Sequence, residues 1–136
     1  MIKIKKIFIT LLFIIFCCTS NSLAITDSLI GTIGNKPLTE SDIISEMKML
    51  LIINGQTITK EQEKELQAVA LQQITKRLIK QTEIEKYNIA NFDELAANEE
   101  IKKIANKLNI SVDNLKESFR SNEISYSRLT NLIETE

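Results

Sequence analysis

The sequence predicts a mainly α-helical domain of five helices, preceded by a short N-terminal β-hairpin. Two observations carry this prediction. Two of the three glycines and the only proline lie within residues 31–37, so the turn-forming residues are concentrated in one place. After Thr39, apolar residues recur every three to four positions, which is the spacing of one helix face.

The hairpin is expected from two short apolar runs, residues 28–33 and 36–38, joined by Gly34-Asn35. Glycine supplies the positive φ that two-residue hairpin turns require. Pro37 cannot donate a ladder hydrogen bond, so the second strand should be a short edge strand.

The helices are expected from caps and stop signals. Thr39 caps the first helix, with Asp42 three residues later, and Asn54-Gly55 ends it. A second, long helix should run from a Thr59–Gln62 cap to Tyr87, with Asn88 as its stop. A third is predicted over residues 93–107, and Ser111 and Ser125 are expected to cap a fourth and a fifth.

The apolar spacing also predicts which side chains face the interior. They are Ile43, Ile44, Met47, Leu50 and Leu51 in the first helix, Leu66, Ala70, Leu71, Ile74, Leu78, Ile79 and Thr82 in the second, Leu95, Ile101, Ile104, Ala105 and Leu108 in the third, Leu115 and Phe119 in the fourth, and Leu129, Leu132 and Ile133 in the fifth.

The first 24 residues are typical of a cleavable signal peptide. Three lysines precede an apolar run from Ile7 to Cys18, and Ser22-Leu23-Ala24 provides small residues at the cleavage site. The run is shorter than the roughly 20 residues that a membrane span needs, although an uncleaved anchor is the alternative. We therefore expect residues 1–24 to be a signal peptide and residues 25–136 to be one exported, periplasmic domain with no membrane attachment after cleavage.

The composition of this domain excludes several classes of function. Three of the 17 basic residues lie in the signal segment, so 14 remain against 18 acidic residues, a net charge of −4 that argues against nucleic-acid binding. With no histidine, and both cysteines in the signal segment, Ser-His or Cys-His catalysis and the usual zinc sites are not available. We expect no enzyme activity, cofactor or metal.

One apolar cluster suggests a binding surface. Met49, Ile52 and Ile53 lie off the main apolar stripe of the first helix, so its last turn is apolar on nearly every side. The simpler explanation is burial on two sides. The alternative explanation is functional: the residues form an adaptable surface that binds a polypeptide client, because methionine suits promiscuous binding. The candidate client-binding residues are Met47, Met49, Leu50, Ile52 and Ile53.

The order of five short segments resembles a known family. They are Ile33-Gly-Asn-Lys-Pro-Leu-Thr-Glu-Ser-Asp-Ile43, Ala70-Leu-Gln-Gln-Ile74, Lys86-Tyr-Asn-Ile89, Ile104-Ala-Asn-Lys-Leu-Asn-Ile-Ser-Val-Asp-Asn-Leu115 and Ile124-Ser-Tyr126. In this order they are similar to the N-terminal domain of SurA-type periplasmic chaperones, which are relatives of the parvulin prolyl isomerases.

The resemblance implies an ATP-independent chaperone in outer-membrane protein biogenesis, with unfolded or partly folded polypeptides as partners and outer-membrane protein precursors as its clients. Two departures stand out. The family's usual Asn-Gly is Gly34-Asn35 here, and the parvulin domains that follow in the family are missing from a sequence that ends at Glu136. No isomerase site can therefore be carried over.

Two further expectations concern assembly. The alternative to a chaperone is a truncated or structural module that assembles with a separate partner chain and has no chaperone activity of its own. In addition, Leu129, Leu132 and Ile133 lie in a short final helix that needs a surface to pack against. A second copy of the chain would provide one, so the sequence predicts a homodimer, or client binding in the same place.

Overall fold

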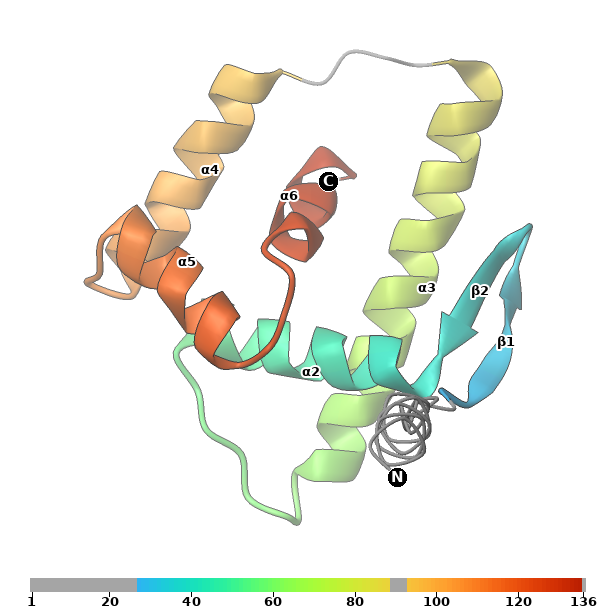
Figure 1. The fold of residues 1–136 in the computed structure, drawn as a ribbon, viewed down its shortest axis with the longest axis horizontal. Helices are drawn as coiled ribbons and strands as arrows, with labels where there is room; N and C mark the ends of the chain where they lie inside the picture. The colour runs from blue at the N-terminus through green and yellow to red at the C-terminus, as the bar shows by residue number, and fades with distance from the viewer. Residues whose placement is uncertain (1–26, 89–92, 136) are drawn as a thin grey trace, which may run out of the picture.

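The computed structural model describes residues 27–88 and 93–135. The elements follow in the order β1 (Leu29–Ile33), β2 (Lys36–Thr39), α2 (Glu40–Asn54), α3 (Glu63–Tyr87), α4 (Glu94–Lys107), α5 (Val112–Ser121) and α6 (Ser127–Glu134) (Figure 1). The predicted fold, five helices after a hairpin, is confirmed. The predicted signal peptide, residues 1–24, lies outside the described residues. Within the described ranges, no helix is both long and apolar enough to cross a membrane.

The hairpin forms where the sequence predicts it. β1 and β2 pair antiparallel, with Ile33 opposite Lys36 and Thr32 opposite Pro37. Gly34 begins the turn with a φ of 61°, a conformation that favours glycine. An ion pair between Lys36 and Glu85 ties the hairpin to α3.

The caps of α2 are those that the sequence predicts. The Thr39 hydroxyl accepts a hydrogen bond from the Asp42 backbone N–H, and the Asp42 carboxylate accepts one from the Thr39 N–H, which completes a capping box. Gly55 ends the helix with a φ of 63°, and a Cβ there would lie 2.9 Å from Leu108. Glycine suits this position because its φ is positive, and any larger residue would also require the Leu108 side chain to move.

Two predicted helix starts are wrong by a few residues. The Thr59 N–H does bond to the Gln62 side chain, but α3 begins only at Glu63, so this contact organises the preceding turn. α6 begins at Ser127 without a side-chain cap, and the Ser125 hydroxyl is bonded to the Ser127 hydroxyl instead. The predicted Ser111 cap of α5 is confirmed, and α4 begins within a residue of the predicted start, where Asp93 caps it.

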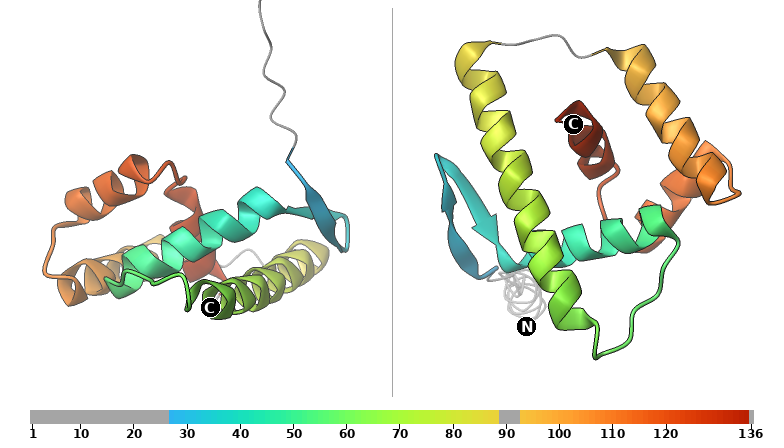
Figure 2. Two further views of the ribbon diagram at one scale, coloured as in Figure 1. Left: turned by 90° about the horizontal axis from the view of Figure 1, so that it is seen from below. Right: turned by 180° about the vertical axis from the view of Figure 1, so that it is seen from behind.

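The helices surround two hydrophobic cores that share α2. In Figure 1, α2 crosses α3 at one side of the molecule and approaches α5 at the other, whereas α6, which also contacts α2, lies in the middle of the view; Figure 2 shows the crossing from two further directions. The larger core consists of Met49, Ile101, Ala105, Leu115, Phe119, Ile124 and Leu129. The smaller core consists of Leu38, Ile43, Ala70 and Ile74.

A buried ion pair lies where α2 and α3 meet. The Glu46 carboxylate bonds to the Arg77 guanidinium, and the exposed fractions of the two side chains are 0% and 6%. The buried stripe of α2 is therefore Ile43, Glu46 and Met49, and that of α3 is Ala70, Ile74 and Arg77. The apolar spacing in the sequence predicts no charged residue on these faces, so neither member of the pair was expected there.

Several apolar side chains that were predicted to face inward are exposed. Ile44 is 47% exposed, Leu71 38%, Ile79 50% and Leu95 79%. The stripe of α2 is shifted because Glu46 occupies an interior position, and the stripe of α3 is shifted because Arg77 does. Leu95 lies in the first turn of α4, where Asp93 caps the helix, and points to solvent.

The final helix packs within its own chain. Leu129 is fully buried in the larger core, and Leu132 and Ile133 are partly buried against it. These residues thus find the surface they need within their own chain, and they give no reason to expect a second copy; the homodimer stays a prediction. Lys80 of α3 also donates a hydrogen bond of 2.6 Å to the Thr135 carbonyl at the end of α6.

Replacement of Met49 by alanine should destabilise the fold by about 2–5 kcal/mol, because it removes a fully buried side chain from the larger core and leaves a cavity. Chemical denaturation followed by circular dichroism would measure the free energy of unfolding. Ile44→Ala in the same helix is the matched control, and it should cost much less because Ile44 is 47% exposed. Equal losses in the two variants would show that Met49 is not part of the core.

Replacement of Asp42 by asparagine should make stability less dependent on pH. Burial raises the pKa of the Asp42 carboxyl, but hydrogen bonds from Arg128 and Thr39 outweigh it and hold the pKa below its ordinary value. A depressed pKa in the folded state stabilises the protein above the unfolded-state pKa of about 3.9, and this contribution is lost as the pH falls through the folded-state pKa.

Urea unfolding of the two proteins at pH 7 and at about pH 3 would measure this effect. At pH 7, Asp42→Asn should cost about 0.5–1 kcal/mol, and the difference from the wild type should shrink at low pH. Arg120→Gln, which breaks an exposed pair with Glu117, is the control and should change stability by less than about 0.5 kcal/mol. A difference that is constant across the pH range would contradict the prediction.

Candidate functional site: an apolar groove between α2 and α3

The structure separates the five predicted client-binding residues into two groups. Met49 is fully buried, and Ile52 and Ile53 pack against the same core. These three side chains face α4, α5 and α6, so the expectation that they form an exposed surface is corrected in favour of the simpler explanation, burial on two sides of the helix. Met47 and Leu50 face the other way, are only partly buried, and line hollows in the surface.

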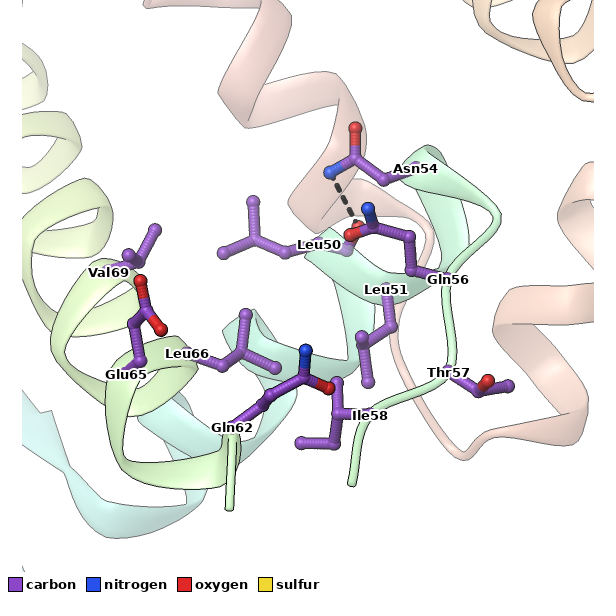
Figure 3. A pocket seen from close by; sticks show the side chains of 10 residues that line it. All are labelled: Leu50, Leu51, Asn54, Gln56, Thr57, Ile58, Gln62, Glu65, Leu66 and Val69. Carbon is purple, nitrogen blue, oxygen red and sulfur yellow. Dashed lines mark hydrogen bonds between the residues drawn. The ribbon is translucent and has the colours of Figure 1, made fainter. Parts of the chain in front are cut away.

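The larger hollow is a groove of about 430 Å³ between the end of α2, the loop of residues 55–62 and the start of α3. Its apolar lining comes from all three segments, as Figure 3 shows: Leu50, Leu51, Ile58, Leu66 and Val69. The polar lining residues are Asn54, Gln56, Thr57, Gln62 and Glu65. The groove is thus apolar in its walls and rich in amide groups around them.

A second hollow of about 320 Å³ lies on the α2–α3 surface, and Leu51 lines both. Its other lining residues are Glu40, Ile43, Ile44, Met47, Lys48, Glu63 and Gln67. Ile44, Met47 and Leu51 follow one another at helical spacing, so they form one apolar strip along α2. The two hollows are therefore neighbouring parts of one surface.

Local hydrogen bonds fix the shape of the groove. The Gln56 backbone N–H donates to the Leu51 carbonyl at 3.0 Å, and the Asn54 side chain donates to the Leu50 carbonyl at 2.9 Å (Figure 3). At the other end of the loop, the Gln62 N–H donates to the Thr59 carbonyl at 3.1 Å. Both ends of the loop are thereby closed by turns, which hold Ile58 between the two helices.

The charges around these two hollows are mainly negative. Glu40, Glu63 and Glu65 line them, and Lys48 is the one cationic lining residue. The Lys48 ammonium donates to the Asn122 carbonyl. Close to the groove, a hydrogen bond from the Thr59 side chain holds the pKa of Glu61 below its ordinary value, so that carboxylate is ionised at neutral pH.

The groove offers surface for binding, and its lining shows no arrangement for catalysis. Its polar residues are amides, one hydroxyl and one carboxylate, with no nucleophile held beside a base. Among the residues that the structure describes, no three histidine, cysteine, aspartate or glutamate side chains lie close enough to hold a metal ion.

The sequence pattern predicts little of the groove. It places Leu51 and Leu66 in the interior, gives no role to Ile58 and leaves Val69 outside the predicted stripe. One signal was present for Ile58, which is the only apolar side chain in the polar segment Gly55–Glu61. An isolated apolar residue in a polar loop needs a surface to pack against, and here it packs across the space between two helices.

Comparisons with known proteins add no relative to this description. No family model, curated protein or solved structure matches the chain.

Proposed function

We propose that this protein binds segments of unfolded or partly folded polypeptides in the α2–α3 groove and acts as an ATP-independent, chaperone-like domain. One observation supports the proposal above all others. Five apolar side chains from three separate segments line an open groove of about 430 Å³, and Val69 among them is 41% exposed. Clefts with mainly apolar walls and a few polar groups are the usual form of binding sites on proteins.

The lining fits an unfolded chain better than a small polar ligand. A polypeptide segment offers apolar side chains to the walls and backbone N–H and C=O groups to the rim. The Gln56 amide can both donate and accept hydrogen bonds, and the Gln62 NH₂ group can still donate, so they can meet a backbone of any sequence. The apolar strip along α2 extends the contact beyond the groove.

The class of client follows from the resemblance to SurA-type chaperones, which implies outer-membrane protein precursors. The strands of such proteins alternate apolar and polar residues, and they expose their apolar faces before they insert into the membrane. A groove that accepts apolar side chains without reading their sequence suits such a client. With the predicted signal peptide, the proposal places this activity in the periplasm, as binding without catalysis.

Replacement of Val69 by aspartate should weaken binding of an unfolded outer-membrane protein by about tenfold, because burying a valine side chain contributes about 1.5 kcal/mol. The matched control is Leu71→Asp. Leu71 lies on the same helix and is 38% exposed, but it does not line the groove. Binding would be measured by fluorescence anisotropy of a labelled, urea-unfolded barrel protein, and function by suppression of its aggregation.

Circular dichroism and thermal unfolding would confirm that both variants are folded. Unchanged affinity in Val69→Asp, or an equal loss in Leu71→Asp, would exclude the groove as the binding surface. If the wild-type protein neither binds the unfolded chain nor delays its aggregation, the proposed function itself is wrong.

A second candidate function is that of a structural module that assembles with a partner chain, or with a second copy of itself. The observation in its favour is that α3 keeps three large apolar side chains exposed: Leu71 is 38% exposed, Ile79 50% and Tyr87 61%. Large apolar residues on one helix often mark a protein interface.

Sedimentation equilibrium over a wide range of protein concentrations distinguishes the two functions. A chaperone that keeps its groove free should sediment as a monomer, because α6 already packs within its own core. If the wild-type protein instead forms a stable dimer, and the double variant Tyr87→Ser/Ile79→Ser is a monomer, the result would support the assembly module and the predicted homodimer.

A further inference from the structure

We propose that the loop of residues 55–62 is a strap over the α2–α3 groove, in which Ile58 occupies the place of a client side chain and gives way when a client binds. The inference rests on the proposed function, because it concerns how the same groove takes up and releases its polypeptide. Figure 3 shows Ile58 extending from the loop toward the space between Leu51 of α2 and Leu66 of α3. An apolar client side chain would bind in this same place.

Ile58 is the one residue of this loop whose side chain is partly buried. All other residues from Gly55 to Gln62 are exposed, and each of them is polar or glycine. Leu51 and Leu66, which line the groove beside Ile58, are themselves only partly buried, and the groove between them stays open. One apolar side chain in an incompletely filled groove therefore holds the centre of the loop to the helices.

Hydrogen bonds fix the two ends of the loop and leave its centre unattached. At the α2 end, Gly55 has a φ of 63°, and its N–H donates to carbonyls in the last turn of the helix. At the α3 end, the Thr59 N–H donates to the Gln62 side chain at 3.2 Å. Within residues 27–88 and 93–135, no hydrogen bond involves Thr57 or Ile58. The centre of the loop can therefore swing outward without breaking a hydrogen bond.

A client side chain and Ile58 compete for the same apolar surface. Ile58 is tethered by a short loop between the end of α2 and the start of α3, so its effective concentration at the groove is high. While it lies in the groove, the apparent affinity for a client is reduced in proportion to the fraction of molecules whose groove is vacant. Such a strap covers apolar surface when no client is present, and it helps to release a bound client without ATP.

Replacement of Ile58 by serine should raise the affinity for a labelled, urea-unfolded barrel protein by about fivefold, because it removes the apolar competitor. A fixed wall would give the opposite sign, since the same change would then remove surface that the client contacts. Thr57→Ser, at the adjacent exposed position, is the matched control and should change the affinity by less than about twofold. Fluorescence anisotropy would measure the affinities, and circular dichroism would confirm that both variants are folded. Unchanged or weaker binding by Ile58→Ser would overturn the proposal.

Thiol labelling follows the position of the strap directly. The two cysteines of the chain are Cys17 and Cys18, so a variant with both replaced by serine and with Ile58→Cys has a single thiol. Binding of the unfolded barrel protein should speed the modification of this thiol by N-ethylmaleimide at least about threefold, because the bound client keeps the side chain out of the groove. If binding instead protects the thiol, the side chain stays in the groove as a wall and the proposal is wrong.

The same thiol tests the strap without any client. A strap opens by local motion, so the rate of modification should stay constant in urea concentrations too low to unfold the domain. A side chain that is exposed only by global unfolding would react faster as urea lowers the free energy of unfolding, and this result would overturn the proposal. Absence of client binding in both the wild type and Ile58→Ser would contradict the proposed function, whereas urea-dependent labelling contradicts the strap alone. The two failures can therefore be told apart.

Discussion

The ion pair between Glu46 and Arg77 is the contact on which the arrangement of α2 and α3 depends. Both side chains are almost fully buried, and each alone would be an uncompensated charge in the interior. They are tolerable only when α2 and α3 cross at the place where carboxylate and guanidinium meet. The pair therefore restricts the crossing more than apolar packing alone would, since apolar surfaces can slide past each other at little cost. The same crossing of the two helices brings Leu50 of α2 and Val69 of α3 together as lining of the groove.

α2 contributes buried side chains to both hydrophobic cores, so both halves of the structure pack on it. Met49 faces the larger core, with α4, α5 and α6, whereas Ile43 faces the smaller core, with α3 and the hairpin. A helix used in this way has apolar residues on most of its circumference. This explains the apolar last turn of α2 without an exposed client-binding surface there, and it leaves Leu50 and Leu51 to form the wall of the groove.

Features set by local chemistry could be predicted from the sequence, and features set by long-range pairing could not. Gly34, Thr39, Gly55, Asn88 and Ser111 act through their own backbone or their nearest neighbours, and each lies where the sequence placed it. Glu46 and Arg77 are 31 residues apart, and single-sequence patterns assign such residues to the surface. Because the pattern assigns Glu46 and Arg77 to the surface, the buried faces that it predicts for α2 and α3 differ from the observed ones, and so do the predicted binding residues.

The two hydrophobic cores differ in size, and the part of the molecule around the smaller core should open more readily. The larger core has seven buried residues and the smaller has four, so the hairpin and α3 should form the less stable cooperative unit. Within residues 27–88 and 93–135, the Lys80–Thr135 hydrogen bond links α3 to the end of α6. Local opening should therefore separate α3 from α2 while α4, α5 and α6 stay folded. The backbone amide protons of α3 would then exchange with solvent sooner than those of α5, and the groove would widen to admit bulkier segments in the open state.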